Sequence, residues 1–197
     1  MNVVGYVLAG GQSARMGQDK AVLPWGEKTL LDHALARLRA ATSRTPAILC
    51  GPTRRYEDRG IPVFPDSREG KGALGGVLTG LEKLPPDAEC GLFLAVDLPL
   101  VPAGLLRRYL ERMEEGIDAV VAVSPGGPEP LCALYARSCL EPVRRCVDDG
   151  RLEMTSFWTA VCVHVFYPGA LAEFGDPAQI FQNVNAREDY ERLKALA

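Results

Sequence analysis

A loop near the start of the chain carries residues suited to binding a polyphosphate. It follows an apolar run over 3–8, which predicts a buried strand, and the adjacent Gly10 and Gly11 allow a sharp turn with no Cβ in the way. Backbone N–H groups in such a turn can point inward and hold an anion. Arg15 and Lys20 add two cations, of which arginine can bind a phosphate with two N–H groups. Together these residues favour a phosphate-binding loop over a plain glycine turn with solvated charges.

This loop matches neither of two common phosphate motifs. A dinucleotide-binding fingerprint requires G-x-G-x-x-G, whereas the first glycines here are adjacent. A P-loop requires lysine directly after its last glycine, whereas Gly17 is followed by Gln18 and Asp19 before Lys20. The loop therefore argues against a plain Rossmann-type dinucleotide binder.

Two aspartates follow predicted strands. Asp97 ends the most hydrophobic run of the chain, 91–96, where a carboxylate is costly unless it is paired or bound to a cation. Beside a polyphosphate the natural partner is Mg²⁺, and we favour this role over a cap of the helix expected from residue 103. Asp66 follows the short predicted strand 61–65, and it either accepts hydrogen bonds from a base or ribose or is an ordinary loop carboxylate.

Two asparagines lie near the end of the chain. Asn183 and Asn185 occupy alternate positions of a run expected to be extended, so their side chains would point the same way. They either reach the metal or phosphates or cap the last helix, which is expected from about 187 to 196.

The order of the elements predicts the fold. Strands alternate with helices through the first 120 residues, which indicates a single α/β domain over 1–197 with a doubly wound, mostly parallel sheet. Further expected segments are an extended piece at 21–26, a helix from Thr29 with Asp32 in a capping box, a glycine-rich stretch at 70–80 that leads into a helix, and a loop at 124–130 before a strand at 131–135. Ligands of such sheets bind at the carboxyl ends of the strands, so the 8–20 loop, Asp66 and Asp97 should converge on one crevice.

Composition limits the function classes. The 197 residues are 47% hydrophobic and 24% charged with a net charge of −3, which gives no sign of nucleic-acid binding. No apolar run is long enough to cross a membrane, and the first residues lack a cleavable signal, so we expect a cytoplasmic protein. We also expect a monomer. The six cysteines are scattered and are expected to be small buried hydrophobic residues.

Several motifs resemble, in order, those of the molybdenum cofactor guanylyltransferases, a family of nucleotidyltransferases. The similar segments are LAGGxxxRMGxDK at 8–20, Asp66, GxLxG at 72–76, DLP at 97–99, PLCALY at 130–135 and FxNVN at 181–185. The double glycine is similar to the GTP-using branch, because related cytidylyltransferases tend to have Ala-Gly there. Two departures are Ala73, where the family often has proline, and Ala186-Arg187, where it often has Thr-Pro.

The resemblance implies a Rossmann-like nucleotidyltransferase fold and transfer of GMP from GTP to the terminal phosphate of molybdopterin. The alternatives are a cytidylyltransferase that uses CTP or a transferase with another phosphorylated acceptor. The resemblance also implies catalytic roles for Arg15, Lys20 and Asp97, with Mg²⁺ held by Asp97. The implied nucleotide-binding residues are Leu8, Ala9, Gly10, Gly11, Lys20, Asp66 and Asp97, with Asn183 and Asn185 as a further site. Transient contact with molybdoenzymes and other proteins of cofactor synthesis is also expected.

Overall fold

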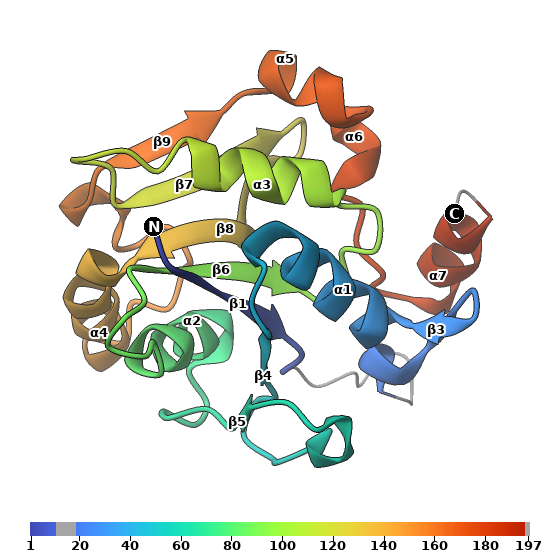
Figure 1. Ribbon diagram of the computed structural model, residues 1–197, viewed down its shortest axis with the longest axis horizontal. Coiled ribbons are helices and arrows are strands. Elements are labelled where there is room, and N and C mark those ends of the chain that lie inside the picture. Colours follow the sequence, from blue (N-terminus) through green and yellow to red (C-terminus); the bar gives the residue numbers. More distant parts are fainter. Residues whose placement is uncertain (11–18, 196–197) are drawn as a thin grey trace.

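A seven-stranded sheet forms the centre of the molecule in the computed structural model, which describes residues 1–10 and 19–195 (Figure 1). Its strands, in spatial order, are β5 (Val63–Phe64), β4 (Ala47–Leu49), β1 (Val3–Leu8), β6 (Cys90–Ala95), β8 (Gly127–Ala136), β7 (Ala119–Ser124) and β9 (Val163–Phe166). Neighbouring strands are parallel from β5 to β6 and again between β7 and β9, whereas β8 runs antiparallel to both β6 and β7. The predicted mostly parallel sheet is confirmed.

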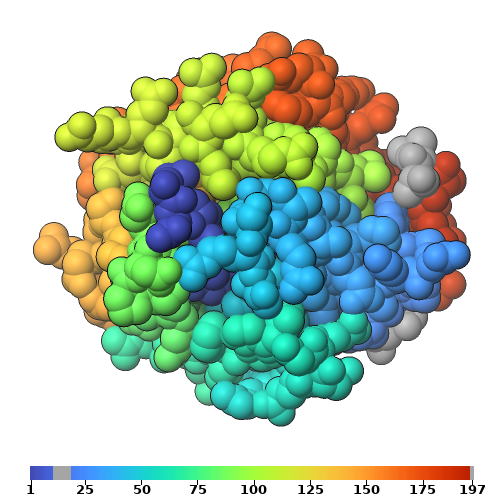
Figure 2. All heavy atoms as spheres, in the orientation of Figure 1, coloured from blue at the N-terminus to red at the C-terminus, as the bar shows by residue number. Residues whose placement is uncertain are grey.

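Helices cover both faces of this sheet. On one face α1 (Leu30–Thr42) packs beside α3 (Ala103–Glu111), and Figure 2 shows the two next to each other on the surface. On the other face α2 (Gly72–Glu82) packs against α4 (Leu140–Asp148). Short helices complete the C-terminal region: α5 (Pro168–Leu171), α6 (Pro177–Ile180) and α7 (Arg187–Lys194). The arrangement is the doubly wound one that the alternation of elements predicts.

Two apolar cores lie on the two faces of the sheet, because side chains alternate along each strand. Along β6, Leu92 and Leu94 join the core under α1 and α3, whereas Phe93 joins the core under α2 and α4. All three side chains are fully buried. Complete burial of one such side chain contributes about 1.5–3 kcal/mol, so the central strands fix the sheet on which the site residues stand.

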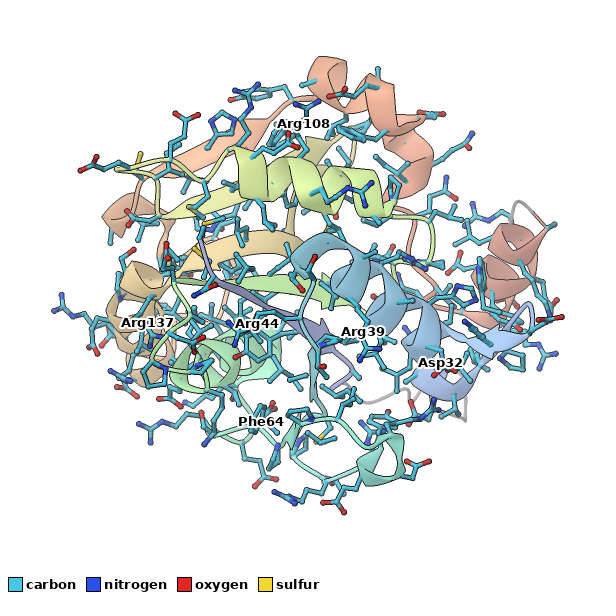
Figure 3. All side chains as sticks on the ribbon, viewed as in Figure 1. Asp32, Arg39, Arg44, Phe64, Arg108 and Arg137 are labelled. Atoms are coloured by element: carbon cyan, nitrogen blue, oxygen red, sulfur yellow. The ribbon has the colours of Figure 1, made fainter. Side chains whose placement is uncertain are left out.

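Helix α1 begins where the sequence predicts. The Thr29 hydroxyl accepts from the Asp32 N–H at 3.2 Å, and the Asp32 carboxylate accepts from the Thr29 N–H at 3.0 Å, which completes a capping box. Asp32 also pairs with Arg59, and Figure 3 places Asp32 in the first turn of α1 beside the β3 strand (Lys28–Thr29).

Three expected segments differ from the structure. The stretch 21–26 is extended only in its second part: its first residues belong to the 3₁₀ helix η1 (Lys20–Val22). Leu23 is extended, and β2 (Pro24–Trp25) forms a hairpin with β3, which Gly26 closes at φ +65°. The glycines at 72–80 lie inside α2 rather than before it. Two of them let the helix approach the sheet closely: a Cβ would lie 3.0 Å from Leu8 on Gly76 and 2.5 Å from the Phe93 ring on Gly80. The loop at 124–130 is a tight turn, since Ser124 pairs with Gly127 and β8 already begins there.

Five of the cysteines are buried, as predicted, whereas Cys162 is exposed. In the described ranges, no helix combines the length and apolar character needed to cross a bilayer.

Candidate active site

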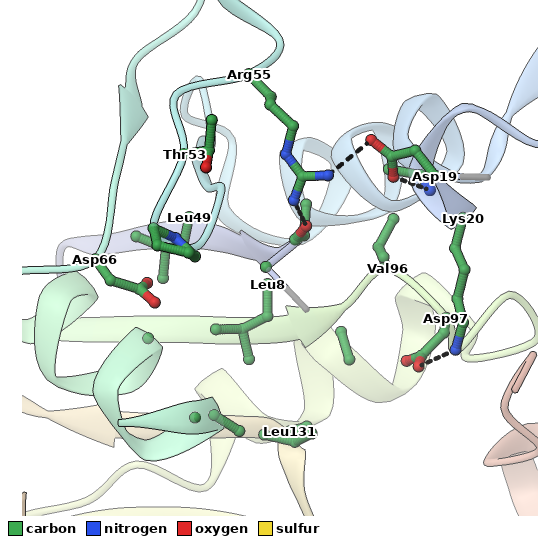
Figure 4. A pocket seen from close by; sticks show the side chains of 18 of the residues that line it. Leu8, Asp19, Lys20, Leu49, Thr53, Arg55, Asp66, Val96, Asp97 and Leu131 are labelled. Atoms are coloured by element: carbon green, nitrogen blue, oxygen red, sulfur yellow. Dashed lines mark hydrogen bonds and ion pairs between the residues drawn. The ribbon is translucent and has the colours of Figure 1, made fainter. Parts of the chain in front are cut away.

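A cavity of about 810 Å³ opens at the carboxyl ends of β1, β4, β5 and β6. This volume suits a ligand of nucleotide size. Its wall includes the three features that the sequence predicts to converge, namely the ends of the 8–20 loop, Asp66 and Asp97. Figure 4 places Asp66 at one end of the cavity and Asp97 with Lys20 at the other, with Leu8 between them. The predicted crevice is confirmed.

The backbone that leaves β1 is fixed to both neighbouring strands. The Ala9 N–H donates to the Leu49 carbonyl at 2.9 Å, and the Val96 N–H donates to the Leu8 carbonyl at 3.1 Å. At Gly10 a Cβ would lie 2.8 Å from the Gly51 backbone, so only glycine fits there. Leu8, Ala9 and Gly10 line the cavity as predicted. Gly11 and Arg15, which the sequence assigns to the same loop, lie outside the described residues.

The end of the cavity where metal and phosphate binding are predicted holds an ion pair. Lys20 Nζ lies 3.6 Å from Asp97 Oδ2, and their side chains are 18% and 26% exposed. Lys20 also donates to Asn185 Oδ1 at 3.4 Å. Burial raises the pKa of Asp97, and the nearby positive charge of Lys20 opposes that rise. A cation beside this carboxylate is therefore favourable, as the sequence analysis expects.

Two contacts hold the turn that carries Asp97. The Val184 N–H donates to the Asp97 carbonyl at 2.9 Å, and Arg37 of α1 donates to the Leu98 carbonyl at 2.9 Å. Burial lowers the pKa of Arg37 to about 10, so this guanidinium is still charged at neutral pH. The carboxylate thus stands on a backbone fixed from both sides.

The other end of the cavity presents Asp66. Its N–H donates to the Gly51 carbonyl at 2.9 Å, and the next residue, Ser67, donates its N–H to the Thr79 hydroxyl of α2 at 2.9 Å. The Asp66 side chain is partly buried, and within the described part of the chain it makes no hydrogen bond or ion pair. Burial raises the pKa of Asp66. A ligand with N–H or O–H donors would satisfy this carboxylate.

The two asparagines separate in role. Asn185 contacts Lys20 from outside the cavity wall, whereas Asn183 is exposed and makes no side-chain hydrogen bond in the described ranges. Neither caps α7 with its side chain, because the carboxylate of Asp189 accepts from the Asn185 and Ala186 N–H groups at 3.1 and 3.0 Å. Contact of either asparagine with a metal or phosphate stays a prediction.

Three residues without a role in the sequence analysis form a network beside the cavity. The Asp19 carboxylate accepts from Arg55 at 3.1 Å and from the Tyr56 hydroxyl at 2.5 Å, and both Asp19 and Arg55 line the cavity. Asp19 belongs to the 8–20 motif, and this membership could have identified it as a site residue. Arg55 and Tyr56 lie 36 and 37 residues further along the chain, in a segment without a hydrophobic period, so sequence reasoning had no signal for them.

The donor set fits a metal that arrives with its ligand. No cluster of three or more His, Cys, Asp or Glu side chains able to hold a metal occurs within residues 1–10 and 19–195. Asp97 offers one carboxylate, and Mg²⁺ is commonly held by one or two carboxylates while phosphate oxygens and waters complete its shell. The residues therefore fit a nucleotide-bound divalent cation better than a site made by protein alone.

Comparisons with known proteins identify the family of the chain. Residues 5–160 match the MobA-like NTP transferase domain. The chain is 33% identical over 192 residues to a probable molybdenum cofactor guanylyltransferase of Carboxydothermus hydrogenoformans, with 98% of this chain and 95% of that protein covered.

Solved structures share the fold. Molybdopterin-guanine dinucleotide biosynthesis protein A from Archaeoglobus fulgidus matches with a TM-score of 0.79 at 23% identity, over 98% of this chain and 97% of that chain. A Mycobacterium tuberculosis protein solved as a complex with manganese matches with a TM-score of 0.68 at 19% identity, over all of both chains. The fold expected from the resemblance is confirmed.

Proposed function

Because the chain belongs to the family of MobA-like NTP transferases, we propose that it transfers GMP from GTP to the terminal phosphate of molybdopterin. An oxygen of that phosphate forms a bond to the α-phosphorus of GTP, the bond from this phosphorus to the β-phosphate oxygen breaks, and pyrophosphate leaves. The product is the guanine dinucleotide form of the cofactor. The proposal covers one nucleotidyltransferase domain over residues 1–197 that acts as a cytoplasmic monomer, with transient contact to molybdoenzymes and other proteins of cofactor synthesis.

One observation carries the proposal. A single cavity has a lysine–aspartate ion pair at one end and a carboxylate without a protein partner in the described chain at the other (Figure 4). The first end suits a triphosphate and its metal, and the second suits the N–H groups of guanine. A nucleoside triphosphate laid across the cavity satisfies both ends.

The attacking phosphate is already an anion, so the reaction needs no strong general base. Catalysis then consists of positioning the reactants and neutralising the charge that moves to the leaving group. Lys20 neutralises the triphosphate and stabilises the departing pyrophosphate, with Arg15 as a second cation. The Gly10 and Gly11 backbone brings N–H donors close to the phosphates. Asp66, together with the 8–10 backbone, binds the guanosine.

The metal proposed is Mg²⁺, held by Asp97. When bound, it supplies charge neutralisation on the phosphate oxygens. Asp97 already lies beside a positive charge, that of Lys20, at this end of the cavity, and the burial that raises its pKa favours any further cation. The donor chemistry supports one carboxylate as the protein's share of the metal shell.

The decisive experiment incubates the protein with GTP, Mg²⁺ and molybdopterin and follows pyrophosphate release. We expect release that depends on all three, with a guanine dinucleotide product detected by mass spectrometry. A parallel reaction with CTP tests the alternative branch. Clear turnover with CTP and none with GTP would overturn the choice of nucleotide, and release without molybdopterin at the same rate would overturn the acceptor.

A further inference from the structure

The Asp19 carboxylate is held from three directions. Its Oδ1 accepts from the Ala21 N–H at 3.0 Å, which caps η1, and its Oδ2 accepts from Arg55 and from the Tyr56 hydroxyl. Lys20 is the next residue and the first of η1. The place of the Lys20 ammonium therefore depends on where the Asp19 carboxylate is held.

Arg55 joins this carboxylate to two strand ends. Its Nη2 donates to the Ala9 carbonyl at 3.3 Å, just past β1, and to the Cys50 carbonyl at 3.1 Å, just past β4. Its Nη1 contacts Asp19. Ala9 and Asp19 flank residues 10–18 of the phosphate-binding loop in the chain, so one guanidinium contacts both ends of that loop (Figure 4).

Tyr56 is held in place for the same contact. It has the left-handed backbone conformation, φ +67°, which is unusual for an aromatic residue, and its side chain is buried. Burial, with the hydrogen bond to Asp19, raises the pKa of Tyr56, so its hydroxyl remains protonated and can donate. The Arg55 guanidinium also stacks 5.3 Å from the centre of the Tyr56 ring.

We propose that Arg55, supported by Tyr56, is a positioning residue that holds Asp19 against the ends of β1 and β4 and thereby sets Lys20 for the triphosphate. A Lys20 side chain that starts from a fixed backbone loses less conformational freedom when it binds a phosphate. A planar guanidinium can donate hydrogen bonds to three acceptors at once, whereas the ammonium group of lysine lacks this planar arrangement of donors. This inference rests on the proposed use of a nucleoside triphosphate, and it adds a residue outside the 8–20 motif.

Arg54 provides a matched control. It is the neighbouring arginine, its side chain is 62% exposed, and it pairs with Glu57 rather than with Asp19. Arg54→Gln and Arg55→Gln therefore change the charge equally. Tyr56→Phe removes the hydroxyl, and Tyr56 does not belong to the cavity wall, so its effect on a nucleotide can pass only through Asp19.

The first test measures the affinities for GTP and for guanosine by calorimetry. We expect the affinity for GTP to fall about 10-fold in Arg55→Gln and about 3-fold in Tyr56→Phe, because each variant loses hydrogen bonds to a charged group. The affinity for guanosine should change less than about 2-fold. Arg54→Gln should leave both affinities near wild type, and Arg55→Lys should behave like Arg55→Gln. Equal weakening by Arg54→Gln, equal loss of guanosine, or wild-type affinity in Arg55→Lys would overturn the proposal.

A second test does not depend on the nucleotide. Amide hydrogen exchange in a peptide covering 8–22 should be faster in Arg55→Gln than in Arg54→Gln, measured without nucleotide, while peptides of β6 and α1 keep their protection. Unchanged exchange in 8–22 would overturn the positioning role of Arg55 even if the wild-type protein turns over GTP. Conversely, faster exchange in Arg55→Gln, together with no GTP binding by the wild type, would support the positioning role of Arg55 and overturn the proposed function.

Discussion

The two ends of the cavity have the same construction and different chemistry. Asp66 and Asp97 each stand two residues beyond a parallel strand, β5 and β6, which lie on opposite sides of β1. Burial raises the pKa of both carboxylates. Asp97 pairs with Lys20, whereas the Asp66 side chain has no polar partner in the described part of the chain.

This difference indicates which kind of ligand group each end is made for. A partly buried carboxylate costs free energy unless a cation or donors compensate it. At Asp97 the protein itself supplies the compensation, which a metal can share. At Asp66 a ligand with donor groups can supply the compensation, so we propose that Asp66 contributes to recognition and Asp97 to chemistry.

Substitution at the Asp97 end should have the largest effect. We expect Asp97→Asn to lower the rate of GMP transfer by about 100-fold or more, because the charge that we propose to hold the metal is lost. Pyrophosphate release at saturating GTP and Mg²⁺ measures it, and a thermal melt checks that the protein is folded. Asp87→Asn, at an exposed ion pair with Arg44, is the matched control and should keep full activity. Activity of Asp97→Asn within threefold of wild type would refute the metal role.

The next effect separates the phosphates from the nucleoside. We expect Lys20→Met to weaken GTP by at least about 10-fold while guanosine binding changes little, since a charge-assisted contact to phosphate contributes roughly 1.5–3 kcal/mol. Lys28→Met, on the exposed strand β3, removes the same charge without reaching the cavity. Calorimetric titration of both ligands measures the split. A parallel loss of guanosine affinity would show that Lys20 does not distinguish the two ends.

Substitution at the Asp66 end should give the opposite pattern. Asp66→Asn keeps the shape but offers an amide N–H₂ to the donors of guanine, so guanosine and GTP should both weaken about 10-fold. The rate at saturating GTP should stay within about threefold, because uniform binding affects KM rather than kcat. A large fall in kcat with unchanged guanosine affinity would show that Asp66 acts in the chemical step, and the two ends of the cavity would then not differ in role.

The sequence was sufficient to place both aspartates at the cavity because each signal is local. A run of apolar residues followed by a carboxylate marks the end of a buried strand, and parallel strand ends share one edge. The Thr29–Asp32 capping box is local for the same reason. Each of these predictions needs only a few neighbouring residues.

Features that depend on contacts between distant segments were predicted wrongly or not at all. Arg55 reaches Asp19 and Ala9 from 36 and 46 residues away, and no period in its own segment marks it. The glycine-rich stretch 70–80 was expected to precede a helix rather than to lie within it, because the close approach of Gly80 to Phe93 in β6 depends on tertiary packing. Pro128 and Pro130 likewise concealed the start of β8, where pairing with β7 overrides the local signal for a loop.

The smallest effect concerns stability, and it tests the contrast without any ligand. Both folded-state pKa values are raised, so the folded protein binds these protons more tightly than the unfolded chain does. Each carboxylate therefore lowers stability as pH rises from the ordinary aspartate value through the raised one. Asp66→Asn removes this cost, and its melting temperature should exceed that of the wild type by about 1–3 °C at pH 8, once solvent screening is allowed for, and match it at about pH 3, below the ordinary aspartate pKa. Asp97→Asn removes the same cost but also the carboxylate partner of Lys20, so its gain at pH 8 should be smaller. Differential scanning calorimetry in metal-free buffer measures both, and a larger gain for Asp97→Asn would mean that Lys20 does not compensate the Asp97 charge.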